Sequence, residues 1–268
     1  MLRTTSALVA ALACSAACTS APPANDLLLA TLYVNASAEY DAACRTVYAA
    51  AIQRLEDVAA RSSRSDRPLA MVMDVDETVL DNSPYEARLV EEGTSYPAGW
   101  DEWCMEAAAP VVPGASDCIQ RARQLGIEVF FVTNRKAHLE EGTRVNLEHL
   151  GLFEARSFDT LLMRGERPEW TSDKSSRRGA VEATHEIVAL VGDNVRDFFE
   201  FKSEEPTNVE RASAVDARAT EWGTRWFMLP NPMYGGWDEA AVEYDYRAPA
   251  GTLRALRRAG LDDLRADG

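Results

Sequence analysis

Cysteine is scarce in this chain, and its spacing excludes two classes of protein. Five cysteines occur in 268 residues, and beyond Cys18 only Cys44, Cys104 and Cys118 remain. None stands in a Cys-x-x-Cys pair or a Cys/His cluster, so a zinc site is not expected. An odd and sparse set builds no disulfide framework, although one bridge is compatible with an oxidising compartment.

Positive charge is also in short supply. Lysine and arginine number 28 against 43 aspartates and glutamates, which gives a formal net charge of −15 and a pI near 4.7. No basic stripe offsets this surplus, so a nucleic-acid polymer is not expected as a partner. Such a composition suits a small anionic substrate whose charge is balanced by a metal.

Long apolar runs are absent as well, and the N-terminal one is too short to span a bilayer as a helix. Residues 7–13 are apolar, follow the basic Met1-Leu-Arg3 and precede the small residues Cys14-Ser-Ala-Ala-Cys18. This order is typical of a secretory signal. The small-small-Cys ending resembles a bacterial lipobox, which predicts a signal peptide over residues 1–18 and a lipid on Cys18.

The predicted lipid anchor has consequences for location. It attaches the protein to a membrane of the cell envelope, at the outer membrane or facing the periplasm, through a tether over residues 19–32 that contains Pro22-Pro23. Lipidation at Cys14 stays open, and so does plain secretion with cleavage after Ala17 or Ala21.

Beyond the tether, apolar runs alternate with stretches of helical periodicity, which predicts an α/β fold with a doubly wound, mainly parallel sheet. We expect strands over residues 69–73, 127–132, 158–163, 187–192 and 226–229. Helices are expected over residues 33–61 (one helix or a pair), 114–126, 137–150, 177–185 and in the tail after residue 244. The long insert after the first strand, about residues 84–113, reads as a helical cap.

The central feature is Asp74-Val-Asp76, where the first buried strand ends. Ligands of open α/β sheets bind outside the carboxyl ends of the strands, so Asp74 is placed for chemistry. A calcium-binding EF-hand loop is excluded, because Val79 and Tyr85 occupy the positions that need glycine and glutamate. Taken alone, the pair is also compatible with a helix cap and a solvated turn.

Three further polar segments follow the first in order. Thr133-Asn134-Arg135 follows the second strand and precedes a helix, Lys174 precedes another helix, and Gly192-Asp193-Asn194-Val-Arg-Asp197 ends the fourth strand. Independent caps and turns rarely reproduce such an ordered set. The set therefore predicts one site at the carboxyl edge of the sheet.

This ordered set resembles the haloacid dehalogenase-like superfamily of phosphotransferases. Within it, residues 72–85 and 187–198 resemble the two signature stretches of class C acid phosphatases, the lipoprotein-e type, and residues 130–136 and 229–237 resemble further segments. The resemblance implies one haloacid dehalogenase-like domain over residues 33–268, with an N-terminal helix and the cap. It also implies a Mg²⁺-dependent phosphomonoester hydrolase.

Roles for single residues follow from the resemblance alone. Asp74 is the nucleophile that forms an aspartyl-phosphate, and Asp76 is the general acid and base. Mg²⁺ is held by Asp74, the backbone carbonyl of Asp76 and Asp193, with Asp197 supporting a bound water. Thr133 and Lys174 hold the phosphoryl oxygens, whereas Asn134 and Arg135 receive no chemical role.

Substrate preference is expected to come from aromatic residues in and near the cap. The family favours Trp103 and Tyr234 as platforms that stack on the base of a nucleoside 5′-monophosphate, while core packing is the alternative for each. A phosphotransferase that uses alcohol acceptors and a catalytically silent surface lipoprotein are the competing functions. The sequence leaves the oligomeric state open, a homodimer included.

Overall fold

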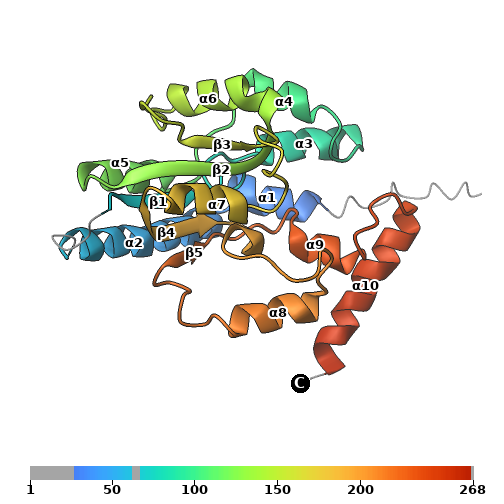
Figure 1. The fold of residues 1–268 in the computed structure, drawn as a ribbon. Helices are drawn as coiled ribbons and strands as arrows, with labels where there is room; N and C mark the ends of the chain where they lie inside the picture. The colour runs from blue at the N-terminus through green and yellow to red at the C-terminus, as the bar shows by residue number, and fades with distance from the viewer. Residues whose placement is uncertain (1–26, 62–66, 267–268) are drawn as a thin grey trace, which may run out of the picture.

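A parallel sheet in the order β3-β2-β1-β4-β5 organises the computed structural model, which describes residues 27–61 and 67–266 (Figure 1). The strands are β1 (Leu69–Met73), β2 (Glu128–Lys136), β3 (Leu161–Arg164), β4 (Glu186–Gly192) and β5 (Trp226–Met228). All neighbouring pairs run parallel. The α/β, doubly wound prediction is confirmed, and all five strands occur where the sequence indicated them.

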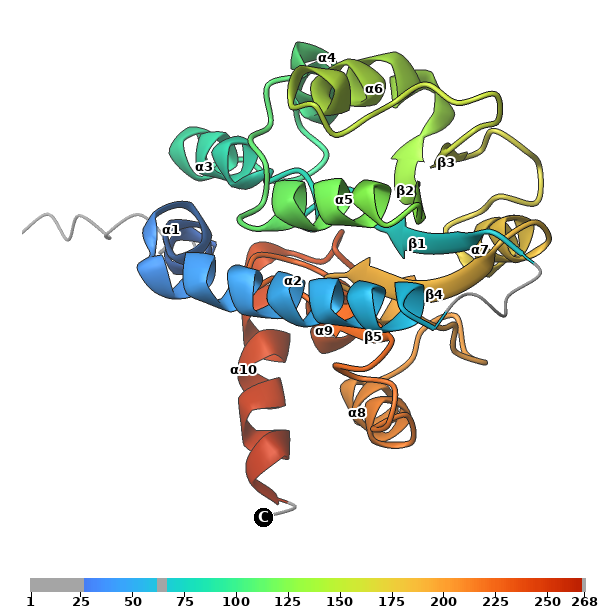
Figure 2. The ribbon, with the colours of Figure 1, turned by 90° about the vertical axis from the view of Figure 1, so that its left-hand side faces the viewer.

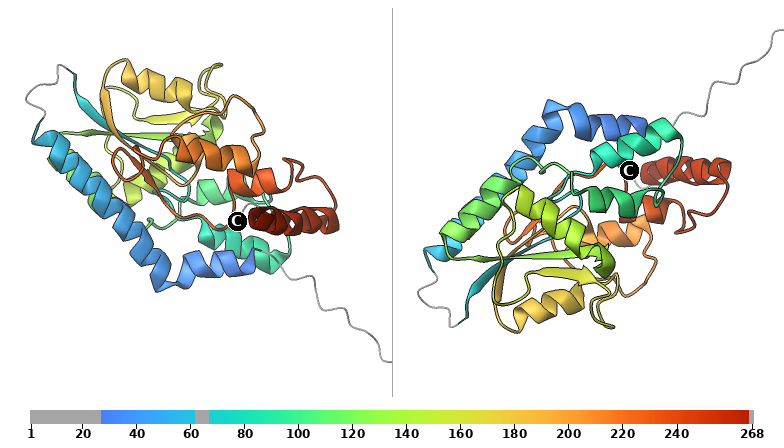
Figure 3. Two further views of the ribbon diagram at one scale, coloured as in Figure 1. Left: turned by 90° about the horizontal axis from the view of Figure 1, so that it is seen from below. Right: turned by 90° about the horizontal axis from the view of Figure 1, so that it is seen from above.

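Side chains alternate between two cores on the faces of the sheet, because successive residues of a strand point to opposite sides. Met71 and Met73 of β1 pack in the core covered by α2 (Ala38–Ala59) and α5 (Ala115–Gln124). Ala70 and Val72 pack in the core beneath α7 (Ser175–Glu182) and α8 (Asn208–Asp216). Figures 2 and 3 show these helices on the two sides of the sheet.

The N-terminal helical region is a pair of helices. Helix α1 (Leu28–Ala36) is followed by α2, which starts after Ser37, whose side chain accepts a hydrogen bond from the backbone N–H of Tyr40. Such a cap satisfies a donor that the first turn leaves free. Helix α1 begins at Leu28, inside the range 19–32 assigned to the tether, because it packs on α2 and α3 through the buried Val34 and the partly buried Ala30.

The insert after β1 is helical and forms the cap. It contains α3 (Ser83–Glu92) and α4 (Trp100–Glu106), and α4 rests on α6 (Glu140–His149). Gly142 of α6 makes this close packing possible, since a Cβ atom there would lie 2.4 Å from the carbonyl oxygen of Cys104. The cap is therefore seated on the helix that follows β2.

The C-terminal region adds α9 (Gly236–Ala241) and α10 (Ala250–Ala266). The sequence-predicted tail helix is present and extends away from the sheet, next to α9 (Figures 1 and 2). Arg257 pairs with both carboxylate oxygens of Asp238 at 2.7 and 2.8 Å and so fixes α10 to α9.

Two findings concern the N-terminal predictions and the cysteines. The signal peptide and Cys18 lie outside the described residues, and no helix within those residues has both the length and the apolar character of a membrane span. Cys44, Cys104 and Cys118 are all buried and free.

Candidate active site

Three carboxylates meet at the carboxyl edge of the sheet. Asp74 follows β1, Asp193 follows β4, and Asp197 ends a short 3₁₀ turn, Val195–Asp197. One oxygen of each lies within 4.8 Å of the others. Residues more than a hundred positions apart converge because β1 and β4 are adjacent parallel strands that end at the same edge.

Lys174 joins this group from α7. It occupies the N-cap position of that helix, and its Nζ atom lies 2.5 Å from Asp74 Oδ1 and 2.6 Å from Asp197 Oδ1. Burial opposes the charge of Lys174, but Asp197 and Asp74 outweigh it and raise the pKa of the ammonium above its ordinary value. Lys174 is therefore charged and fixed between two carboxylates.

The carboxylates are held close together at an electrostatic cost. Burial raises the pKa of Asp74 to about 7, with Asp197 and Asp76 adding to the rise and Lys174 opposing it. Burial, followed by the charges of Asp197 and Asp74, raises the pKa of Asp193 well above its usual range. With all three carboxylates ionised, the single ammonium would leave two negative charges uncompensated, which is why burial and mutual repulsion favour the protonated forms.

A divalent cation with oxygen ligands fits this donor set. Carboxylate oxygens within bonding reach of one point are what Mg²⁺ and similar hard cations require, and such an ion would cancel the remaining charge. The side chain of Asp76 is not part of the group. The residues present therefore fit a metal that is bound by Asp74 and Asp193, with Asp197 beside it.

Asp197 depends on a glycine for its position. A Cβ atom on Gly192 would lie 2.4 Å from Asp197 Oδ2, so only glycine lets the 3₁₀ turn fold back on β4. The same Oδ2 atom accepts a hydrogen bond from the backbone N–H of Asn194 at 2.9 Å, and Oδ1 binds Lys174. In this structure Asp197 orients the lysine.

Asp193 is held by residues from both sides. Asn231 Nδ2 donates to Asp193 Oδ2 at 2.8 Å, and the Thr78 hydroxyl donates to Oδ1 at 3.4 Å. The loop that carries Asn231 is fixed in turn by Trp237, whose indole N–H donates to the carbonyl oxygen of Asn231. Sequence reasoning missed Asn231, although it lies in the quoted segment 229–237.

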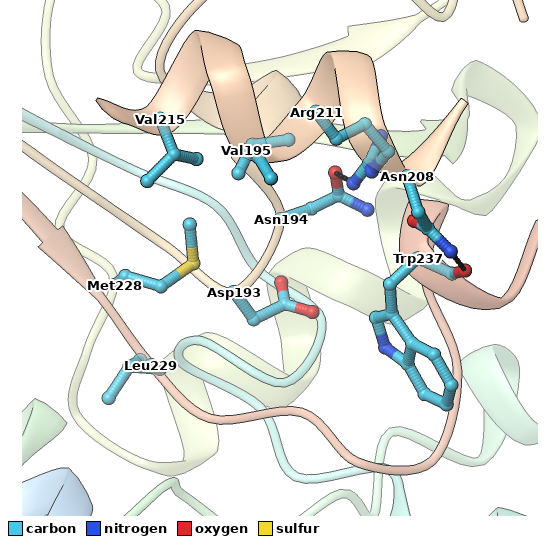
Figure 4. A pocket seen from close by; sticks show the side chains of 10 residues that line it. Asp193, Asn194, Val195, Asn208, Arg211, Val215, Met228, Leu229 and Trp237 are labelled. Carbon is cyan, nitrogen blue, oxygen red and sulfur yellow. Dashed lines mark hydrogen bonds between the residues drawn. The ribbon is translucent and has the colours of Figure 1, made fainter. Parts of the chain in front are cut away.

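A cavity of about 320 Å³ borders Asp193 between α8 and the ends of β4 and β5 (Figure 4). Its wall combines apolar side chains of these elements with a polar end near Asp193, and it is lined by Asp193, Asn194, Val195, Asn208, Arg211, Ala212, Val215, Met228, Leu229 and Trp237. This space keeps the carboxylate of Asp193 close to solvent on the α8 side.

Asp76 lies in a different network, beneath the cap. Its Oδ1 atom accepts hydrogen bonds from Arg135 Nε at 2.9 Å and from Asn82 Nδ2 at 2.9 Å, and Arg135 also approaches it through a second guanidinium nitrogen at 2.8 Å. Arg135 is 2% exposed. Sequence analysis assigns this arginine no chemical role, and no local signal indicates its pairing with Asp76.

Thr133 is fully buried, and its environment differs from the expected helix N-terminus. Strand β2 continues through Lys136, so Thr133-Asn134-Arg135 lies within the strand, because β3 extends the ladder beyond the apolar run. The hydroxyl oxygen of Thr133 accepts from the backbone N–H of Arg135 at 3.0 Å, and its carbonyl accepts from Arg177.

Arg177 ties two of the predicted phosphate-binding elements together. This fully buried residue of α7 donates to the Thr133 carbonyl, to Asn134 Oδ1 at 2.7 Å and to the carbonyl of Thr171 at 2.7 Å. The end of β2 and the loop before Lys174 are thereby held in one arrangement. Burial lowers the pKa of Arg177 to about 10, so the guanidinium remains charged at neutral pH.

The two aromatic residues predicted to stack on a base differ in burial, and for Trp103 the structure shows the alternative of core packing. Trp103 is only 3% exposed, its ring lies between Tyr85 and Arg88, and its indole N–H donates to Asn82 Oδ1 at 2.8 Å. The structure therefore packs Trp103 in the core and leaves it no free face, because its ring closes the cap over Asn82.

Other aromatic side chains stand closer to solvent. Tyr234 is half-buried against the core. Tyr96 of the cap is 62% exposed and meets the half-buried Trp100 edge to face at 5.9 Å. After burial, the charge of Asp76 is the largest influence that raises the pKa of Tyr96, which places Tyr96 near the predicted acid.

Comparison with known proteins gives consistent matches. The family model described as HAD superfamily, subfamily IIIB (Acid phosphatase) matches residues 6–237. The class C acid phosphatase from Bacillus anthracis superposes with a TM-score of 0.80 at 31% identity, covering 87% of this chain and 95% of that chain. The same enzyme with tungstate bound gives 0.79 at 31% identity and the same coverage. Acid phosphatase 1 from Solanum lycopersicum is 29% identical over 198 residues, 70% of this chain and 69% of the relative.

Proposed function

We propose that this chain, which belongs to subfamily IIIB of the HAD superfamily (the acid phosphatases), hydrolyses small phosphomonoesters. The proposed reaction uses Mg²⁺ and proceeds through a phosphorylated aspartate. Membership makes the chain a phosphomonoester hydrolase. The observation that carries the finer proposal is the group formed by Asp74, Asp193, Asp197 and Lys174 at one edge of the sheet.

In the first half-reaction a carboxylate oxygen of Asp74 attacks phosphorus and the bond from phosphorus to the ester oxygen breaks. Asp76 donates a proton to the departing alkoxide. In the second half-reaction water attacks the phosphorylated Asp74, Asp76 accepts a proton from that water, and inorganic phosphate leaves. Proton transfer of this kind contributes about 10²- to 10⁴-fold.

The negative charge of the phosphoryl group needs compensation. A Mg²⁺ ion held by Asp74 and Asp193 would supply positive charge to the phosphoryl oxygens. Lys174 supplies a second positive charge and Thr133 a hydroxyl. The tungstate bound to the Bacillus anthracis enzyme supports this assignment, because tungstate is a tetrahedral oxyanion like phosphate.

Nucleoside 5′-monophosphates are the proposed substrates. Tyr96 and Trp100 offer an aromatic surface at the cap, next to the Asp76 network, and Tyr234 lies half-buried near Asp193 through Asn231. Stacking of a base on such a ring is worth about 1–3 kcal/mol. Trp103, which is enclosed, would support the cap and not contact the base.

We also propose that the enzyme works outside the cytoplasm on a lipid anchor at Cys18. The support is the order of basic, apolar and small residues before that cysteine. Metabolic labelling with a radioactive fatty acid should mark the protein, and Cys18→Ser should abolish the label. Continued labelling of Cys18→Ser, with loss in a Cys14→Ser variant, would move the anchor to Cys14.

The catalytic proposal is tested with p-nitrophenyl phosphate at mildly acidic pH. Release of p-nitrophenol should stop with EDTA and return with Mg²⁺, and Asp74→Asn should be inactive. Full activity of Asp74→Asn would exclude the covalent route. A panel of nucleotides and sugar phosphates identifies the substrate class, and product analysis with an added alcohol separates hydrolysis from transfer to an alcohol.

A further inference from the structure

We propose that Arg135 is the positioning residue of the general acid and that it connects Asp76 to the cap. This inference rests on the role proposed above for Asp76. Arg135 reaches Asp76 Oδ1 through two nitrogens, Nε at 2.9 Å and Nη2 at 2.8 Å. A buried guanidinium with this contact fixes both the place and the orientation of a carboxylate.

The two carboxylate oxygens of Asp76 differ in their hydrogen-bond donors, and this difference indicates which oxygen transfers the proton. Oδ1 accepts from Arg135 and from Asn82 Nδ2, also at 2.9 Å. Oδ2 has no hydrogen-bond partner within residues 27–61 and 67–266. One oxygen is thus saturated by donors, so the proton that Asp76 gives to the alkoxide, and later takes from water, is carried by Oδ2.

Arg135 is itself fixed from three directions. Its Nη1 donates to the Thr143 hydroxyl of α6 at 3.2 Å, and its Nη2 lies 3.3 Å from Asn82 Oδ1. Its guanidinium also lies over the ring of Trp100, 5.4 Å from the ring centre. Cation–π contact and hydrogen bonds together hold the planar group in one orientation.

Helix α4 of the cap contacts both groups that hold Asp76. Trp100 lies against Arg135, and the Trp103 indole N–H donates to Asn82 Oδ1 at 2.8 Å. The position of α4 therefore determines how the side chain of Asp76 is held. This arrangement gives Trp103 a function that does not require contact with substrate.

The leaving group distinguishes positioning of the acid from general structural support. A p-nitrophenolate departs without a proton, whereas the alkoxide of an alkyl phosphate or a nucleotide needs one. Arg135→Lys keeps the charge but loses the planar fork. We expect it to lower kcat/KM, which reports the phosphorylation of Asp74, about 10²-fold for adenosine 5′-monophosphate and less than about threefold for p-nitrophenyl phosphate. Hydrolysis of phosphorylated Asp74 is common to both substrates, so a loss in that second step lowers kcat for both alike.

Two companion variants make the test decisive. Trp103→Phe keeps an aromatic ring but removes the N–H together with part of the ring system, so it should show the same substrate-selective loss in kcat/KM at about threefold to tenfold. It decides the matter if Arg135→Lys does not fold. Arg144→Lys is the matched control, since Arg144 lies on the exposed surface of α6 and pairs only with glutamates there. It should leave both rates unchanged.

The proposed acid and the proposed positioning fail in different ways. If Asp76→Asn lowers kcat/KM equally for both substrates, the role of Asp76 as general acid is wrong. If the loss of kcat/KM in Asp76→Asn is selective for the nucleotide but Arg135→Lys and Trp103→Phe lower kcat/KM alike for both substrates, the positioning role is wrong and the acid stands. In the double variant Arg135→Lys/Asp76→Asn we expect no loss beyond that of Asp76→Asn, because both changes act on one group.

Discussion

Metal binding and folding stability should be strongly linked in this protein, and Asp193 allows the link to be measured. Within the described chain the three clustered carboxylates are opposed by the single ammonium of Lys174. A cation that binds only the folded state stabilises it by about 2.7 kcal/mol when its free concentration is about 100 times Kd. For a chain of 268 residues this corresponds to a rise of about 5–10 °C in Tm.

When no metal is present, Asp193→Asn should raise the free energy of unfolding, because it removes one of the repelling carboxylates. Two ionised carboxylates whose oxygens lie within 4.8 Å of each other repel by about 3 kcal/mol at an effective dielectric constant near 20. Asparagine keeps the shape, and its amide oxygen can accept from Asn231 Nδ2, while its amide nitrogen faces the Thr78 hydroxyl, which can accept as well as donate. In EDTA we therefore expect the variant to be more stable than the parent by about 1–3 kcal/mol, although it is inactive.

Thermal unfolding followed by circular dichroism, with EDTA and with a Mg²⁺ titration, checks both statements. The parent should gain Tm with Mg²⁺, and Asp193→Asn should begin higher and gain little. Asp57→Asn, on the exposed side of α2, is the control and should behave like the parent. A variant that is less stable than the parent in EDTA, or that keeps the full Mg²⁺ shift, would refute the electrostatic reasoning.

Three other outcomes follow from single contacts. Burial raises the pKa of Glu86 to about 7, so its charge destabilises the fold as pH rises from about 4.5 through 7. Glu86→Gln should therefore raise the free energy of unfolding, measured in urea, by about 3 kcal/mol at pH 8 and by almost nothing at pH 4. Arg177→Met leaves the acceptors at Thr133 and Thr171 unpaired and should cost about 3 kcal/mol in the same assay, with a raised KM. Gly192→Ala displaces Asp197 and should lower kcat about 10²-fold, whereas Gly179→Ala, which has no atom within 4 Å of the added Cβ, should not.

The sheet and the convergence of the aspartates could be predicted because they depend on local pattern and on topology. Buried runs of five or six apolar residues predict parallel strands, and polar residues directly after such strands meet at the carboxyl edge of the sheet. Asp74 and Asp193 therefore came together as expected from sequence. The extent of β2 was underestimated, since its last residues are polar and pair with β3 only through tertiary contact.

The supporting residues could not be predicted, for a physical reason. Arg135, Arg177 and Asn231 act through bonds to residues between 38 and 59 positions away in sequence, and no local periodicity encodes such partners. The burial of Trp103 is similar, because an indole in a short helix is equally compatible with a core and with a binding surface. Side-chain partners have to be read from coordinates.

The active site and the stability of this fold work against each other at the same residues. The carboxylates crowded at the ends of β1 and β4 would be more stable as amides, and Glu86 of the cap helix α3 adds a further buried acid. Attack on a phosphoryl group requires positive charge beside the nucleophile, and clustered carboxylates attract the cation that would supply it. The cluster is therefore kept at a cost in stability. In the proposed mechanism the cluster supplies the nucleophile and binds the cation, and Lys174 limits the repulsion among the carboxylates before the cation binds.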